Sequence, residues 1–240
     1  MFRSPPLAAI LDQEEYTRTV LGIEYDTMLA YWPRWDKSFG IAEDVRSSFD
    51  CEYHASARLS RPGIGDGRSS AIGVMKPSIG VFDAFATSWS ADYFTIALWM
   101  NPPSSWLAGG NSSPLFFDGS GSEGFLLWHP STFSAILAQR SSIAATANSL
   151  TIAGWTHLAV TFAESSQELK IFINGLEAGV ASSDHTNWVT PMSSSISAAI
   201  GGYSWAVPGV NPFNYEVAHV SIWNKPLTSD QIATLAVRPV

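Results

Sequence analysis

Alternation of apolar and polar residues predicts a hairpin in the second half of the chain. Apolar residues recur at every second position through 158–162, stop at the polar segment 164–167, and recur again through 169–173. A period of two on both sides of a turn predicts two antiparallel strands with one buried face. The second strand ends in Asn174-Gly175, a pair that tolerates positive φ, so the chain is expected to reverse tightly into a third strand at 176–180.

Short apolar or alternating runs predict further strands on both sides of this hairpin. They lie at residues 94–100, 115–117, 125–128, 134–138, 196–200 and 217–223. The first of them ends at Pro102-Pro103, because proline cannot donate a hydrogen bond to a neighbouring strand. Many short strands that are joined by turns of small residues are typical of a β-sandwich.

Two helical segments are predicted at the ends of the chain. Residues 7–30 are expected to form a helix with Asp12 as its N-cap, after an extended arm at Pro5-Pro6 that either frays or docks on a neighbouring subunit. The residues expected to lie against the sandwich have helical spacing and are Tyr16, Val20 and Ile23. Near the C-terminus, Thr228 and Gln231 have the spacing of a capping box, which predicts a short helical turn.

The composition fits one all-β domain. The chain has 240 residues, of which 46% are hydrophobic and 14% charged, and we find no internal repeat. We therefore expect an N-terminal arm and helix at 1–30 and a single domain at 31–240. The first residues contain too short an apolar run for a signal peptide or membrane anchor, so we expect synthesis in a cytoplasm and no membrane insertion. Cys51 is the single cysteine, which excludes an intramolecular disulfide.

Charge and motifs argue against nucleic-acid binding and against catalysis. The net charge is −8, from 13 basic and 21 acidic residues, whereas nucleic-acid binding requires clustered Lys and Arg. Glycoside hydrolysis requires a pair of carboxylates on one face, and Glu24 with Asp26, on the expected helix, is the nearest approach. The five histidines are scattered, and no nucleophile motif occurs. We therefore expect a non-enzymatic protein without catalytic residues.

Three segments resemble a known family. Trp155 followed by His157–Thr161 and Ile171–Gly175 resembles the core signature of laminin-G-like or concanavalin-A-like jelly rolls, "G-W-x-H-x-A-x-T … x-I-Y-V-N-G". Tyr93–Met100 resembles a strand of that family, and Ala218–Ile232 resembles its closing strand and short helix. The resemblance implies an all-β jelly-roll sandwich of two antiparallel sheets, with a short N-terminal helix and a short C-terminal helical turn. Function does not follow from the fold alone.

The N-terminal part resembles structural proteins of tailed bacteriophages, in which a short helix precedes a laminin-G-like domain. The matching segments are Leu29–Pro33, Asp36–Asp44 and Arg61–Ala71, and the chain departs from the pattern at Arg34–Asp36 and Ile72–Val74. This resemblance implies a virion component of a bacteriophage, either capsid decoration or part of a tail or fibre. Its implied partners are other virion proteins and further copies of itself in a homo-oligomer. A virion protein made in the host cytoplasm needs no export signal.

Calcium is the one cofactor that the family resemblance leaves open. Many relatives hold Ca²⁺ in loops through carboxylate and carbonyl oxygens. The acids in predicted loops are Asp66, Asp83, Asp118 and Asp184. No three of them form a recognised binding loop, so metal ligands are not assigned and no cofactor is required.

Tryptophans outside the family motifs are the candidate binding residues. Aromatic side chains in or beside loops rich in Gly, Ser and Asn can stack on sugar rings or anchor a protein interface. With two polar companions, the candidates are Trp106, Asn111, Trp128, Trp188, Tyr203 and Trp205. The same aromatics could instead fold back as lids over the ends of the sandwich. Two functions stay open, a virion structural module and a lectin or adhesin for cell-surface glycans, and a polysaccharide hydrolase is a remote third alternative because the carboxylate pair is missing.

Overall fold

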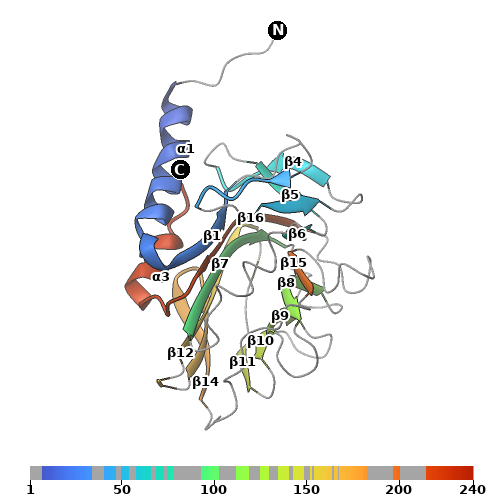
Figure 1. Ribbon diagram of the computed structural model, residues 1–240, viewed down its shortest axis with the longest axis vertical. Helices are drawn as coiled ribbons and strands as arrows, with labels where there is room; N and C mark the ends of the chain where they lie inside the picture. The colour runs from blue at the N-terminus through green and yellow to red at the C-terminus, as the bar shows by residue number, and fades with distance from the viewer. Residues whose placement is uncertain are drawn as a thin grey trace.

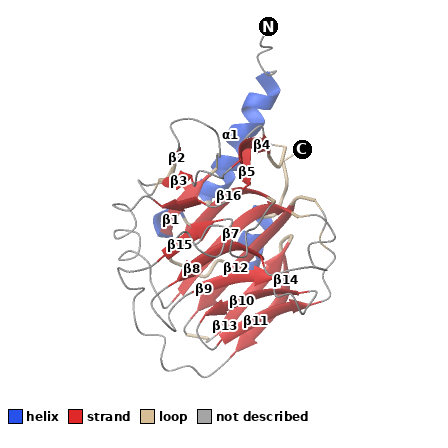
Figure 2. Ribbon diagram, turned by 90° about the vertical axis from the view of Figure 1, so that its right-hand side faces the viewer, coloured by secondary structure: helices blue, strands red, loops and turns tan. Residues whose placement is uncertain are grey.

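A computed structural model of the chain contains two antiparallel sheets and two α-helices in its described part (Figure 1). The described residues are 7–33, 41–46, 50–53, 58–65, 69–72, 75–77, 93–102, 112–118, 125–129, 135–140, 143–148, 152, 154–163, 165–166, 168–182, 197–200 and 215–239. The two sheets form the layers of a sandwich (Figures 1 and 2), which confirms the predicted all-β fold class.

Sheet A holds eight of the described strands and contains the predicted central hairpin. Seven of them follow the order β14-β13-β12-β7-β16-β5-β4, and β1 also pairs with β16. Their bounds are β1 (Met28–Trp32), β4 (Arg58–Pro62), β5 (Ser69–Ile72), β7 (Tyr93–Asn101), β12 (Thr156–Ala163), β13 (Glu168–Ile173), β14 (Leu176–Ser182) and β16 (Glu216–Trp223). As predicted, Asn174-Gly175 turns β13 into β14, and both residues have positive φ.

Sheet B forms the second layer of the sandwich. Its described strands follow the order β11-β10-β9-β8-β15-β6-β3-β2. Their bounds are β2 (Ile41–Ala42), β3 (Cys51–Tyr53), β6 (Met75–Pro77), β8 (Ser112–Asp118), β9 (Phe125–His129), β10 (Ala135–Arg140), β11 (Ile143–Asn148) and β15 (Ser197–Ile200). Chain connections therefore cross repeatedly between the layers, for example from β7 in sheet A to β8 in sheet B.

The N-terminal helix is shorter than the sequence pattern indicates. It spans α1 (Leu7–Gly22), so the predicted helix over 7–30 was too long and the predicted N-cap, Asp12, lies inside it. After Gly22, Glu24 adopts a left-handed conformation (φ 49°), a single turn η1 (Tyr25–Thr27) follows, and β1 begins. The residues of β1 pair with β16 instead of continuing the helix, because the inward-facing side chains of β1 become fully buried in that pairing. None of the described helices combines the length and apolarity needed to cross a bilayer.

Helices α1 and α3 (Ser229–Leu235) cover the face of sheet A that points away from sheet B (Figure 1). Tyr16 and Val20 of α1 are buried, as predicted, and Ile23 is partly buried against the core. The Trp99 indole Nε1 on β7 donates to the Tyr16 hydroxyl (2.6 Å), which donates to the Leu235 carbonyl oxygen of α3 (2.7 Å). One chain of hydrogen bonds thus joins the sheet to both helices.

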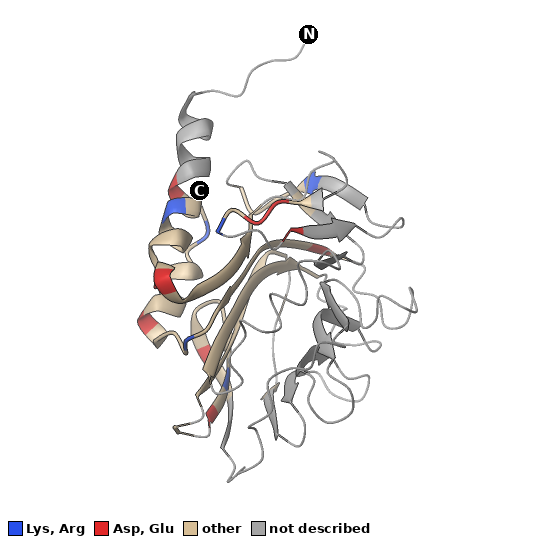
Figure 3. Ribbon diagram, in the orientation of Figure 1, with Lys and Arg blue, Asp and Glu red and all other residues tan. Residues whose placement is uncertain are grey.

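Because of this helical layer, the central strands are buried on both faces. The prediction of a hairpin with one buried face was wrong for β12, where His157, Ala159 and Thr161 are buried as well as the apolar residues between them. The central strands β7, β12 and β16 carry charge only at Glu216, the first residue of β16 (Figure 3). Small or neutral side chains suit a face on which helices pack closely.

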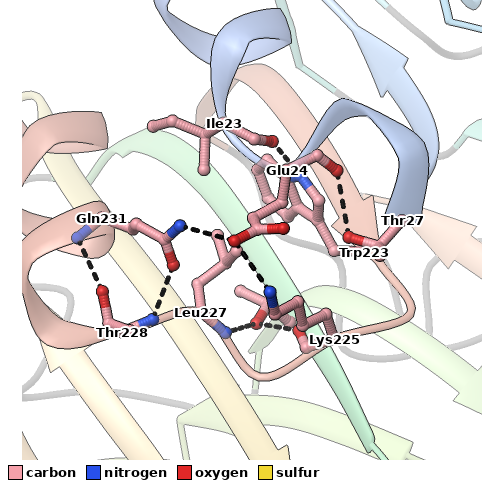
Figure 4. A network of polar contacts seen from close by, with 9 residues as sticks. Ile23, Glu24, Thr27, Trp223, Lys225, Leu227, Thr228 and Gln231 are labelled. Carbon is pink, nitrogen blue, oxygen red and sulfur yellow. Dashed lines mark hydrogen bonds and ion pairs between the residues drawn. The ribbon is translucent and has the colours of Figure 1, made fainter.

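A polar network fixes α3 to the turn that follows α1 (Figure 4). Thr228 and Gln231 form the predicted capping box. The Gln231 side-chain nitrogen also donates to Glu24 Oε1 (3.0 Å), which lies 2.8 Å from Lys225 Nζ. The hydrogen bond from Lys225, and then that from Gln231, lowers the pKa of Glu24. In the same network the Trp223 indole donates to the Ile23 carbonyl oxygen (2.9 Å).

Candidate binding edge

The structure describes the strands that flank the predicted binding residues. Trp128 is in β9, where the backbone alone is described. The other five candidates lie outside the described residues, namely Trp106, Asn111, Trp188, Tyr203 and Trp205. The ends of the neighbouring strands show which of these chain segments share an edge of the sandwich.

In sheet B, three candidate segments attach at the same end of neighbouring strands. Ser112, the first residue of β8, pairs with His129, the last residue of β9. Leu115 of β8 pairs with Ile200, the last residue of β15. Trp128 precedes His129 directly. We call this edge, where β8 begins and where β9 and β15 end, the Ser112 end of sheet B.

In sheet A, the same two crossovers attach at one cross-strand pair. β7 ends at Asn101 and β16 begins at Glu216, and these two residues are partners in the register. The segment 103–111 leads from the end of β7 to Ser112, and the segment 201–214 leads from Ile200 to β16. The strand residues to which the two segments attach are therefore neighbours in both sheets, and we call 103–111 and 201–214 the paired segments.

This topology separates the six candidates into two groups. The paired segments contain Trp106, Asn111, Tyr203 and Trp205, and Trp128 is attached at the same end of sheet B. Asn111 directly precedes Ser112 in the chain, and Tyr203 is the third residue after Ile200. The segment with Trp188 instead enters β15 at Ser197, which pairs with Asp118 at the opposite end.

A polar cluster lies in sheet A where the paired segments attach. Glu216 Oε2 accepts a hydrogen bond from the Asn101 side-chain amide (3.3 Å), and Glu216 Oε1 lies 3.5 Å from Arg61 Nη2. The Glu216 side chain is 15% exposed, and the Arg61 side chain is 47% exposed. A carboxylate, an amide and a guanidinium together can accept and donate hydrogen bonds to hydroxyl groups. Analysis of the sequence missed this cluster, whose members come from three separate strands.

A metal centre or catalytic pair does not emerge from the side chains that the structure describes. No three or more His, Cys, Asp or Glu side chains in this part gather closely enough to hold a metal ion. The candidate calcium acids, Asp66, Asp83, Asp118 and Asp184, have side chains outside the described set. Glu24, considered with Asp26 as a carboxylate pair, is engaged with Lys225 and Gln231.

Comparison with protein families gives the fold a name. Residues 81–233, more than half of the chain, match the family model described as Laminin_G_3, concanavalin A-like lectin/glucanases superfamily. The chain belongs to this superfamily. The match begins before β7 and ends within α3, so it includes both paired segments of the candidate binding edge. None of the curated proteins matches the chain in sequence.

Solved structures of low sequence identity share the fold of this laminin-G-like chain. A Trypanosoma rangeli sialidase in complex with 2,3-difluorosialic acid is 17% identical (TM-score 0.62), over 95% of this chain and 38% of the sialidase. Domain 4 of the extracellular arabinanase AbnA from Geobacillus stearothermophilus, in complex with arabinotriose, is 17% identical (TM-score 0.59), over 88% of this chain and 98% of that domain. The CBM40 of a Ruminococcus gnavus sialidase, bound to α2,3-sialyllactose, is 13% identical (TM-score 0.53), over 64% of this chain and 87% of the CBM40 chain. The fold is therefore lectin-like.

Proposed function

We propose that this protein is a non-enzymatic carbohydrate-binding module whose site lies on the paired segments. The observation that carries the proposal is the shared attachment of both segments at Asn101 and Glu216 in sheet A and at the Ser112 end of sheet B. The two segments that share these attachment points contain the candidates Trp106, Asn111, Tyr203 and Trp205. Two similar folds were solved with an oligosaccharide, arabinotriose or sialyllactose.

The residue types at this edge match what sugar recognition requires. Trp106 and Trp205 offer flat apolar rings for stacking against the C–H face of a sugar, while Asn111 and Tyr203 offer hydrogen bonds to its hydroxyls. Glu216, Asn101 and Arg61 add a charged, partly exposed cluster where the paired segments attach to sheet A. A lectin needs such an aromatic and polar surface but no pair of catalytic carboxylates.

A glycan-binding experiment with matched variants tests the proposal. Saturable binding to a panel of bacterial and algal glycans is expected for the wild type. Replacing Trp106 and Trp205 by Ala should abolish it without changing the fold, whereas Trp188→Ala, in the segment that enters β15 at Ser197, should leave it intact. Binding that persists in the double variant, or no binding to any glycan, would overturn the assignment.

The same panel in calcium and in chelator tests the metal. Loss of glycan binding in chelator, restored by added Ca²⁺, would assign a calcium ion to the site, as the family resemblance allows. Equal binding in both buffers would show that the site needs no metal. Incubation with the bound glycan for a day and analysis of its length tests the non-enzymatic role, because any shortening would reveal a hydrolase.

A second candidate function is a structural role in a bacteriophage virion, as capsid decoration or as part of a tail or fibre. It is supported by the segments whose sequences resemble phage proteins. Of these, Leu29–Trp32 lies in β1, and Arg61–Ala71 begins in β4 and ends in β5. Both β1 and β5 pair with the edge of β16 that lies opposite β7, β5 at Val217 and β1 from Val220 onwards. Mass spectrometry of purified particles should then detect the protein, and its consistent absence from them would exclude this role.

A further inference from the structure

The polar cluster where the paired segments attach to sheet A presents a cation to solvent. The Arg61 side chain is 47% exposed, whereas the Glu216 side chain is 15% exposed. Both carboxylate oxygens of Glu216 have a partner, since Oε1 lies 3.5 Å from Arg61 Nη2 and Oε2 lies 3.3 Å from the Asn101 side-chain nitrogen. A ligand that reaches this cluster therefore meets the Arg61 guanidinium before it meets the carboxylate.

The Arg61 guanidinium keeps most of its hydrogen-bonding capacity for a ligand. A guanidinium carries five N–H donors in one plane. Among the described residues, Glu216 is the only partner of the Arg61 side chain, and it engages Nη2. The ion pair orients the guanidinium and leaves its other donors available. A planar fork of donors suits a carboxylate, which it binds through two parallel hydrogen bonds.

Asn101 adds a hydrogen-bond acceptor to the same cluster. Its side-chain nitrogen donates to Glu216, so its Oδ1 is the atom left to accept. A Cβ built on Gly154 would lie 4.0 Å from Asn101 Oδ1, and apart from the chain neighbours of Gly154 it would meet no other described atom within 4 Å. The lack of a side chain at Gly154 thus leaves room beside Asn101 for the hydroxyl group of a sugar.

We propose that the glycan bound at the candidate binding edge is acidic, with its carboxylate paired to Arg61 and a neighbouring hydroxyl donating to Asn101 Oδ1, while Glu216 positions both residues. This inference rests on the proposed glycan-binding function and names its ligand class, a glycan that contains a uronic acid or another carboxylated sugar. The net charge of the chain is −8, which repels anions at long range. Selectivity for an acidic sugar therefore depends on the local contact with Arg61.

The experiment uses pairs of probes that differ only in their carboxyl groups. Oligosaccharides of alginate, galacturonan and hyaluronan are each compared with the same oligosaccharide after reduction of its carboxyl groups to alcohols. Titration calorimetry of the full chain should show that the acidic member of at least one pair binds about tenfold more tightly. Arg61→Gln should remove this preference and leave the affinity for the reduced member unchanged. Arg61→Lys, which keeps the charge but loses the planar fork, should retain only part of the preference.

Arg18→Gln is the matched control, because it removes the same charge from an exposed position on α1. It should bind both members of each pair as the wild type does, and thermal unfolding should show that all the variants are folded. Equal affinity within every pair, or a preference that Arg61→Gln leaves intact, would overturn this inference while glycan binding itself still stands. Tighter binding to sulfated carrageenan oligosaccharides would overturn the assignment of a carboxylate. No binding to any glycan would overturn both this inference and the proposed function.

Discussion

Gly175 is a residue at which both backbone geometry and packing exclude a side chain. Its φ is +81°, and a Cβ built there would lie 2.9 Å from the Cα of Ala233 in α3. The preceding Asn174 accepts a hydrogen bond from the His157 amide through Oδ1 (2.9 Å). The Asn-Gly pair therefore turns the chain and also makes room for the C-terminal helix.

Gly175→Ala should lower the free energy of unfolding by about 3 kcal/mol, from left-handed strain and from displacement of α3. Gly154→Ala is the matched control, because Gly154 also has positive φ (71°) but no atom closer than 4.0 Å to its built Cβ. Its cost should be about 1 kcal/mol, from strain alone. Urea unfolding of both variants measures the difference, and equal losses would show that contact with α3 has no part in the effect.

His157 is a buried base whose protonation the fold opposes. It is 1% exposed, its ring meets the Trp99 ring edge-on with centroids 5.2 Å apart, and its Nδ1 has no hydrogen-bond partner among the described residues. Burial, and then the nearby His219, lowers the pKa of His157 to about 3. The unfolded chain binds this proton near pH 6.5, so protonation favours unfolding between those two values.

The contribution of neutral His157 to the free energy of unfolding should therefore be fully present above pH 6.5. It should fall as the pH decreases, by up to about 1.4 kcal/mol per pH unit. His157→Phe keeps a ring beside Trp99 and removes the titration. The free energy of unfolding, measured between pH 6.5 and 5, should depend less steeply on pH in this variant. Carboxylates such as Glu24, whose pKa lies below 4.5, contribute only at lower pH. Identical slopes for both proteins would contradict the assignment.

Among the elements, α3 is stabilised at its N-terminus by a capping box. The Thr228 hydroxyl accepts from the Gln231 amide (3.3 Å), and the Gln231 side chain accepts from the Thr228 amide (2.9 Å). Removal of a cap of this kind commonly costs about 1 kcal/mol. Thr228→Ala should lower the unfolding free energy by about that amount, and Ser229→Ala, one residue into the helix, should change it by less than about half as much. Thermal unfolding distinguishes the two, and equal effects would count against the cap.

Strand β16 pairs with β7 along one edge and with β5 and β1 along the other. His219 has a positive φ (50°), and the register between β16 and β7 shifts between Ala218 and Ser221. Before this bulge Val217 pairs with β5, and after it Val220 and its successors pair with β1. Bulges bend a strand and redirect its side chains. At this bulge, His219 Nδ1 lies 2.7 Å from the Tyr31 hydroxyl, which joins β16 to β1.

At the scale of the whole molecule, α1 is part of the core although it begins as an extension. Deletion of residues 1–22 should remove the buried Tyr16 and Val20 and uncover Trp99 and His219, which contact Tyr16. The expected loss is at least about 4 kcal/mol, from two buried side chains alone. Deletion of residues 1–6 is the control and should leave the unfolding temperature unchanged. Dye binding to exposed apolar surface and thermal unfolding measure both, and a fully stable 1–22 deletion would contradict this role.

Local features of this protein follow from its sequence. The central hairpin, its Asn174-Gly175 reversal and the Thr228–Gln231 capping box were predicted correctly, because each depends on residues a few positions apart. The end of α1 was predicted wrongly, since pairing of β1 with β16 takes residues that would otherwise continue the helix. Burial of the second face of β12 also escaped prediction, because it depends on helices at both ends of the chain.

By itself the sequence determined the fold class, the strands with clear alternation and the candidate aromatic residues, because side-chain chemistry and turn preferences act over short distances along the chain. Tertiary structure alone decided which strand ends meet. Asn101 and Glu216, 115 positions apart, form one cross-strand pair, so the segments 103–111 and 201–214 attach at one place in sheet A, whereas the segment before Ser197 attaches at the other end of sheet B. Contacts between such distant residues arise from the packing of the two sheets and the helical layer together, which no local pattern encodes.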